Sequence, residues 1–172
     1  MNYGFIGAGN MAGAIIKGMT IGGGGFDGRD IYVYDLNAEA SENLAAVCGA
    51  NKCASPADVV KSADVLVLAV KPNVMADAVS PIKDTVMEKA PLVISIAAGK
   101  TIEFLEGILS HSLPIVRVMP NINAKVGCAT SAFCPNAVVT EDQKDVVKAL
   151  FSTVGSITEL PEKMFGIHGV IG

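Results

Sequence analysis

Three small residues near the start of the sequence have the spacing of a phosphate-binding turn. Gly7, Gly9 and Ala12 form a G-x-G-x-x-A pattern after the apolar run 3–6 and before a helical pattern. There the first glycine permits a tight turn, the second lets the backbone approach a pyrophosphate, and the third small residue lets the helix pack closely. The helix N-terminus adds free N–H groups and a partial positive charge. The pattern predicts dinucleotide binding; the alternative is a buried helix that packs closely through small residues.

A carboxylate follows the second apolar run of the chain. Asp35 ends the run 31–35, a little beyond the usual interval of about 20 residues, and an intervening glycine-rich loop accounts for the difference. An acid here would bind the adenosine ribose hydroxyls and repel a 2′-phosphate. Residues 36–40 contain no Lys or Arg to hold such a phosphate, so Asp35 favours NAD(H) over NADP(H). A turn or helix-cap role for Asp35 is the alternative.

The segments that must position these residues alternate between strand and helix patterns. This alternation predicts an α/β domain with a doubly wound, mainly parallel Rossmann-type sheet and helices on both faces. Right-handed crossovers then bring the strand C-termini to one edge, where ligands bind. We expect strands at 3–6, 31–35, 64–70, 91–99, 114–121, 128–136 and 156–161, and helices at 10–20, 37–49, 55–63, 73–88 (bent or restarted at Pro81), 101–109 and 140–155.

Further loops should reach the same edge. Pro72 restricts Lys71 to an extended backbone after the third strand. The small Ala97 and Ala98 leave room for a nicotinamide ring, or simply pack a strand end. Asn121 is placed to bind a carboxamide, or simply turns the chain. The candidate cofactor-binding residues are Ile6, Gly7, Ala8, Gly9, Asn10, Met11, Ala12, Asp35, Val70, Lys71, Pro72, Ala97, Ala98 and Asn121.

Composition excludes several other classes of function. The 172 residues suit one domain, and a net charge of −4 argues against nucleic acid or an anionic membrane as partner. No apolar stretch reaches the roughly 18 residues that cross a bilayer. No Lys or Arg precedes Lys17, which argues against a secretory signal peptide. We therefore expect a cytoplasmic location and reduced thiols at the four cysteines.

The sequence offers no obvious catalytic machinery or metal site. The cysteine spacings do not match a zinc site, and the two histidines lie far apart. His168, a lone histidine in an apolar segment, favours a structural role over proton transfer. We find no nucleophile–base arrangement and no pair of carboxylates. The expectation is no catalytic residue and no metal ligand in this chain, with the chemistry supplied by the cofactor.

Taken together, the motifs resemble those of pyrroline-5-carboxylate reductase. The segments GFIGAGNMAGAIIKGM, DVLVLAVKPN, VISIAAGKTIEFLE and IVRVMPNINAKVGCATSAF match in order and spacing, over residues 3 to 163. The resemblance implies NAD(P)H-dependent reduction of the C=N bond of 1-pyrroline-5-carboxylate to L-proline, the last step of proline biosynthesis. It implies cofactor contacts from Ile6 to Ala12, from Val70 to Pro72 and at Ala97–Ala98, with Asn121 nearby. Members often carry Ser, Asn or Arg after the second strand and prefer NADPH, whereas this chain has Asp35.

The resemblance also sets expectations for the C-terminal end. Members continue past a segment like EKMFGIHGVIG into an all-helical domain that forms the dimer and supplies the substrate carboxylate site and a threonine at the imine. We therefore expect an NAD(P)-binding domain over 1–163, the start of the connection over 164–172 with its apolar surface unburied from Met164, and no activity from this chain alone. The full-length protein should be a homo-oligomer. The alternatives are a free-standing NAD(H)-binding module and a related imine or hydroxyacid reductase.

Overall fold

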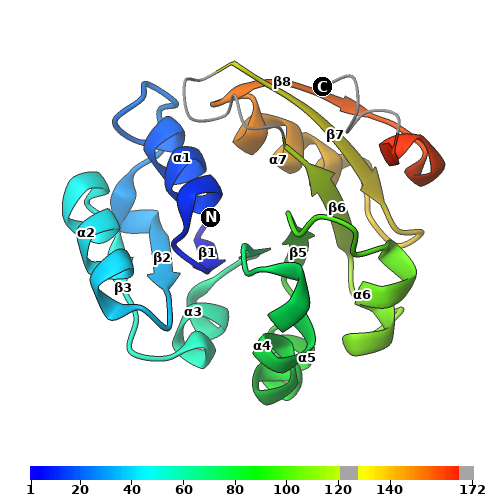
Figure 1. Ribbon diagram of the computed structural model, residues 1–172, viewed down its shortest axis with the longest axis horizontal. Coiled ribbons are helices and arrows are strands. Elements are labelled where there is room, and N and C mark those ends of the chain that lie inside the picture. The colour runs from blue at the N-terminus through cyan, green and yellow to red at the C-terminus, as the bar shows by residue number, and fades with distance from the viewer. Residues whose placement is uncertain (121–127, 167–172) are drawn as a thin grey trace.

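One mixed sheet organises the chain. The computed structural model describes residues 1–120 and 128–166, and within them eight strands pair in the order β3-β2-β1-β4-β5-β6-β7-β8 (Figure 1). The strands are β1 Tyr3–Ile6, β2 Ile31–Tyr34, β3 Asn51–Lys52, β4 Val65–Leu68, β5 Leu92–Ser95, β6 Ile115–Met119, β7 Ala129–Pro135 and β8 Gly155–Glu159. β1 to β6 run parallel, β7 is antiparallel to β6, and β8 is parallel to β7.

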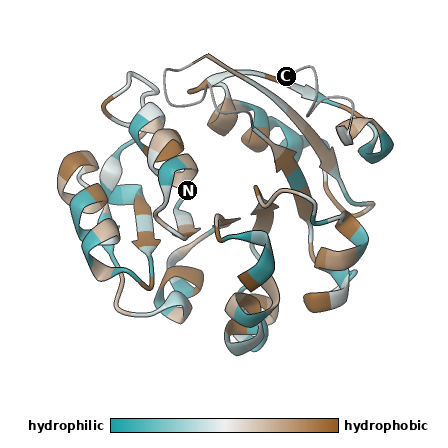
Figure 2. Ribbon diagram, viewed as in Figure 1, coloured by the Kyte–Doolittle hydropathy of each residue, from teal (hydrophilic) through white to brown (hydrophobic). Residues whose placement is uncertain are grey.

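Helices cover both faces of this sheet (Figure 1). They are α1 Asn10–Met19, α2 Ala38–Cys48, α3 Pro56–Ser62, α4 Met75–Val79, α5 Lys83–Lys89, α6 Ile102–Ile108 and α7 Glu141–Phe151. The apolar residues of α1, α2 and α7 pack with Val65 and Val67 of β4 on one face. Those of α3 to α6 pack with Leu66 and Leu68 on the other face. Successive strand residues alternate between the faces, so the central strands are mainly apolar, as Figure 2 shows for β5, although β6 also carries the buried Arg117. The predicted fold class is confirmed.

The helices predicted to begin at residues 37, 55, 101 and 140 have a capping side chain at each of those positions. The side chains of Asn37, Ser55 and Thr101 accept hydrogen bonds from first-turn N–H groups of α2, α3 and α6. Thr140 and Gln143 form a reciprocal capping box at α7. These caps satisfy backbone donors that would otherwise lack partners, which is why the starts were predictable.

One predicted helix is divided at the proline that the sequence indicated, and another ends earlier than predicted. The helix expected over 73–88 is divided into α4 and α5 by a 3₁₀ turn, Ser80–Ile82, because Pro81 lacks an N–H group and its ring disfavours a continuous helix. α7 ends at Phe151, before Gly155, which is the first residue of β8 and not a helix stop. The short strand β3 was not predicted, since both its residues are exposed and carry no apolar signal.

The last two strands correct one expectation about the sheet edge. β7 runs against β6, so the C-termini of β7 and β8 lie at the edge opposite to those of the first six strands. Only residues 120–128 separate β6 from β7, which is too short for the helical crossover that a parallel connection usually needs. The candidate loops after β1, β2, β4 and β5 are unaffected, because all four strands are parallel.

The end of the described chain is better packed than the sequence suggested. Met164 is half-buried, and Phe165 is only 2% exposed. The expectation that apolar surface is unburied from Met164 onward is therefore wrong at Phe165, which covers the guanidinium of Arg117. In the two described ranges no helix is long and apolar enough to cross a membrane.

Gly155 provides a test of the β7–β8 pairing. Its φ is 149°, and a Cβ there would overlap the backbone of Ala129 on β7. We expect Gly155→Ala to lower the free energy of unfolding by about 3 kcal/mol or more. Gly107→Ala in α6 is the matched control, because a Cβ there meets nothing within 4 Å. It should raise stability by about 0.5 kcal/mol. Urea denaturation measures both; equal effects would contradict the strand pairing.

Candidate functional site

The glycine turn lies at the switch point of the sheet. β1 sits between β2 and β4, so the chain leaves it in one direction toward β2 and later returns on its other side as β4. The Gly7 N–H donates to the Tyr34 carbonyl at the end of β2, at 2.8 Å. Gly7 has a φ of 109°, and a Cβ would overlap the carbonyl of Ala69 after β4. Only glycine therefore fits this turn.

The start of α1 is open to an anionic ligand. Gly9 is the N-cap of α1 and supplies no side-chain partner to the first N–H groups of the helix. Gly9 and Asn10 are exposed, and a Cβ at Gly9 would meet nothing within 4 Å. Ala12, by contrast, is 1% exposed and packs into the core below the helix. The turn thus presents uncapped N–H groups on an accessible surface, the arrangement that binds phosphate at helix N-termini.

Asp35 ties this turn to the end of β2. Its Oδ2 accepts the Ala8 N–H at 2.6 Å, and its Oδ1 accepts the Asn37 N–H at 2.8 Å. Asp35 therefore has the turn role that the sequence offered as an alternative to ribose binding. Each carboxylate oxygen has a second lone pair, so acceptor capacity remains for ribose hydroxyls. Binding of ribose by Asp35 stays a prediction.

The loops after β4 and β5 lie next to the turn. The Ala69 N–H donates to the Ile6 carbonyl at 2.8 Å, and the Ile96 N–H donates to the Leu68 carbonyl at 3.2 Å. Ile6, Val70 and Ala97 belong to one apolar cluster. The candidate residues that follow β1, β4 and β5 are thus brought together at one sheet edge.

The side chains of these two loops differ in exposure. Lys71 has the extended backbone expected before Pro72, with φ −61° and ψ 144°, and is exposed. Ala98 is exposed and Ala97 is buried. Exposed Lys71 fits a solvated charge. The predicted cofactor contact Asn121 and the histidine expected to be structural, His168, lie outside the described residues.

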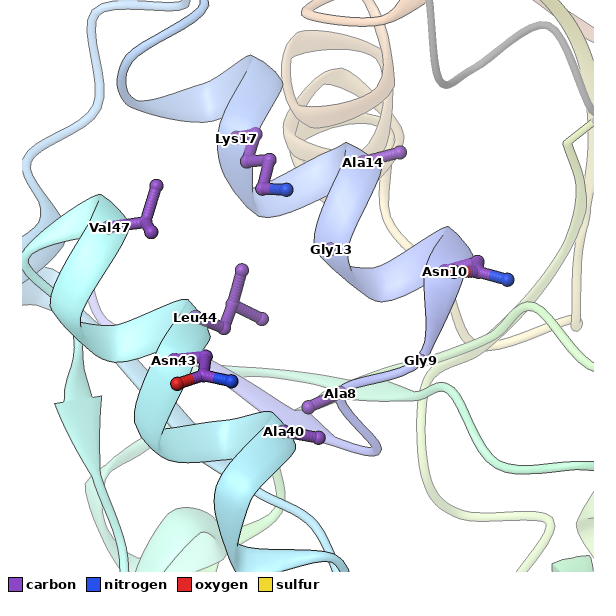
Figure 3. Close-up of a pocket in the computed structure, with 10 residues that line it drawn as sticks. All are labelled: Ala8, Gly9, Asn10, Gly13, Ala14, Lys17, Ala40, Asn43, Leu44 and Val47. Atoms are coloured by element: carbon purple, nitrogen blue, oxygen red, sulfur yellow. The ribbon is translucent and has the colours of Figure 1, made fainter.

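A groove between α1 and α2 extends the site in a direction that the sequence did not indicate. It has a volume of about 440 Å³, and in Figure 3 the side chains of Asn43 and Leu44 on α2 face α1 across it. Three predicted residues, Ala8, Gly9 and Asn10, line the end beside the glycine turn. The others are Gly13, Ala14, Lys17, Ala40, Asn43, Leu44 and Val47. Small residues on α1 were visible in the sequence, but the pairing of α1 with α2 that hollows the surface was not.

The cysteines and the metal-ligating side chains of the described residues are further candidate sources of chemistry. Burial, and secondarily the charge of Asp58, raises the pKa of the Cys53 thiol, so this thiol is protonated and a poor nucleophile at neutral pH. The four cysteines are free thiols. Across residues 1–120 and 128–166, no three His, Cys, Asp or Glu side chains gather to hold a metal ion.

A glycine turn at the switch point of a parallel sheet, backed by an uncapped helix start, defines a dinucleotide-binding domain of the Rossmann type. The family model described as NADP oxidoreductase, coenzyme F420-dependent, matches residues 2–99, more than half of the sequence, and the chain belongs to this family.

Individual relatives are pyrroline-5-carboxylate reductases, which confirms the resemblance read from the motifs. The enzyme of Escherichia coli is 38% identical over 170 residues, covering 98% of this chain and 61% of the relative. The structure of the Coxiella burnetii enzyme has a TM-score of 0.90 at 32% identity. The match covers 95% of this chain and 60% of the chain of that enzyme. The structure of the Plasmodium falciparum enzyme with NADP bound has a TM-score of 0.88 at 27% identity. The match covers 99% of this chain and 62% of the chain of that enzyme. The chain thus spans less than two thirds of the length of these relatives.

The hydrogen bonds of Asp35 can be tested through stability. Asp35→Ala leaves the Ala8 and Asn37 N–H groups without their acceptor and should cost about 2 kcal/mol in the free energy of unfolding. Leu36→Ala is the adjacent control: Leu36 is 92% exposed, so its change should stay within about 0.5 kcal/mol. Urea denaturation at neutral pH measures both. A loss no larger for Asp35→Ala than for Leu36→Ala would show that the carboxylate does not hold the turn.

Proposed function

We propose that this chain is the cofactor-binding part of an NAD(P)H-dependent reductase that converts 1-pyrroline-5-carboxylate to L-proline. The observation that carries the proposal is the open, uncapped start of α1 behind the Gly7 turn, at the switch point of the sheet. The reductases of Escherichia coli and Coxiella burnetii, which match nearly the whole chain, support the choice of imine.

The residues of this chain would hold the cofactor along the strand ends. The N–H groups at the start of α1 would bind the pyrophosphate, and Asp35 the adenosine ribose. The other half of the molecule would then extend over the ends of β4 and β5, where Val70 and Ala97 form the apolar floor and Ala98 leaves space above. When bound, the cofactor would supply a hydride to the imine carbon, and the imine nitrogen would take up a proton.

The charges around Asp35 favour NAD(H). The carboxylate would repel a 2′-phosphate, and the cations of neighbouring segments are paired with acids. Lys52 Nζ on β3 lies 3.8 Å from Glu42 Oε2 on α2, and Arg29 Nη2 lies 2.6 Å from Asp27 Oδ2 before β2. Lys17, which lines the groove, stands near the opposite end of α1 from the glycine turn.

We expect this chain to bind NADH at least about tenfold more tightly than NADPH, because the Asp35 carboxylate should repel the 2′-phosphate. A tenfold ratio corresponds to a repulsion of about 1.4 kcal/mol. Isothermal titration calorimetry with both cofactors measures the ratio. Asp35→Asn removes the negative charge and should reduce the ratio of NADH affinity to NADPH affinity, while Leu36→Ala should leave this ratio unchanged. Tighter binding of NADPH by the unaltered chain would refute the NAD(H) preference.

The reaction itself can be tested with a chimera. This chain replaces the matching segment of the Escherichia coli reductase, which supplies the remainder of that enzyme. Cofactor oxidation that requires 1-pyrroline-5-carboxylate, with proline as product, is the expected result. Gly9→Val should abolish it by filling the phosphate approach, while the remote Gly107→Ala retains it. A folded chimera that binds NADH but forms no proline would favour a cofactor-binding module or a reductase of another imine.

Three further features are proposals: a domain boundary after residue 163 and a homo-oligomer, which rest on the resemblance, and a cytoplasmic location, which rests on the sequence composition. Light scattering of the full-length protein tests the second, and a monomer would contradict it.

A further inference from the structure

A partly buried ion pair connects the end of the described chain to strand β6 of the sheet. Arg117 lies in β6 with its side chain 8% exposed, and its Nη1 is 2.9 Å from Glu162 Oε1. Its guanidinium also lies over the Phe165 ring, 4.7 Å from the ring centre. Glu162 and Phe165 thus enclose a cation that strand β6 could not otherwise bury, because an unpaired charge there would be strongly destabilising.

The same carboxylate oxygen holds a second element. Glu162 Oε1 accepts the N–H of Ile102, the first residue of α6, at 3.0 Å. Ile102 follows the loop that leaves β5 through Ala97 and Ala98. At the other end of this loop the Ala97 N–H donates to Ser95 Oγ at 3.3 Å. The loop is therefore anchored at β5 on one side and at Glu162 on the other.

The sheet register places these groups in one row. Ser95 of β5 is paired with Arg117 of β6, which is paired with Cys134 of β7. Burial, and then the Glu162 charge, raises the pKa of the Cys134 thiol, consistent with a carboxylate close to this row. Glu162 thus bonds to Ile102 after the β5 loop and to Arg117 of β6, and its charge acts on Cys134 of β7.

We propose that Glu162 is a positioning residue for the nicotinamide half of the cofactor. The inference rests on the proposed function, in which the adenosine half lies at β2 and the nicotinamide half extends over β4 and β5. Glu162 does not touch the cofactor: it fixes the loop through Ile102 and is itself held by Arg117. Binding of the adenosine half should not depend on it.

Two ligands separate this role from a general structural one. ADP-ribose contains the adenosine and the pyrophosphate without the nicotinamide, and NADH contains all three. In calorimetric titrations of the 172-residue chain, Glu162→Ala should weaken NADH binding about tenfold and leave ADP-ribose binding within about twofold. Glu162→Gln, which keeps an acceptor oxygen, should lose less. Glu159→Ala is the control: Glu159 pairs with Lys144 at 3.1 Å near the same segment and has no hydrogen bond to Ile102.

The paired variant Arg117→Leu/Glu162→Leu removes both charges, so no unpaired cation destabilises the fold. It should show the same selective loss of NADH binding. Equal losses for both ligands, no loss for either, or wild-type NADH binding by the paired variant would each overturn the positioning role. If the unaltered chain binds neither ligand, the proposed function fails first and the inference with it. If the unaltered chain binds ADP-ribose, and binds NADH with no higher affinity than ADP-ribose, the inference alone fails.

Discussion

The close approach of the backbone at Gly7 to the ends of β2 and β4 is the contact on which the proposed site depends. The Gly7 N–H reaches the Tyr34 carbonyl, and the missing Cβ leaves room for the Ala69 carbonyl. Any side chain would push the turn away from β4 and tilt the start of α1. The free N–H groups would then no longer face the crevice where the strand order reverses. Asp35 secures the same turn from the β2 side through the Ala8 N–H.

Local chemistry explains why much of the fold was predictable from the sequence. The runs that became β1, β4, β5 and β6 are buried on both faces, and this requirement left them mainly apolar, with Arg117 of β6 as the charged exception. Four helices begin where the sequence predicted, because capping depends on residues close in sequence. The caps are Asn37, Ser55, Thr101 and Thr140. The glycine turn was readable for the same reason.

The features that were missed depend on contacts between distant segments. Nothing near Asp35 in sequence shows that its carboxylate accepts the Ala8 N–H, 27 residues away. The groove between α1 and α2 requires the packing of two helices. Arg117 did leave a signal, since a charged residue inside an apolar strand needs a partner, but the partner, Glu162, is 45 residues away. The direction of β7 could have been inferred from the short connection after β6.

The site and the C-terminal segment are parts of one arrangement. Glu162 ties the loop after β5, where the nicotinamide end is proposed to lie, to the segment that ends the described chain. The central claim is that the pyrophosphate of a dinucleotide sits on the start of α1. The most direct measurement is a two-dimensional NMR titration of the labelled chain with NADH. The amide signals of Gly9, Asn10 and Met11 should shift most and saturate together. Shifts confined to Lys17 and Val47, at the far end of the groove, with the turn amides unmoved, would contradict the claim.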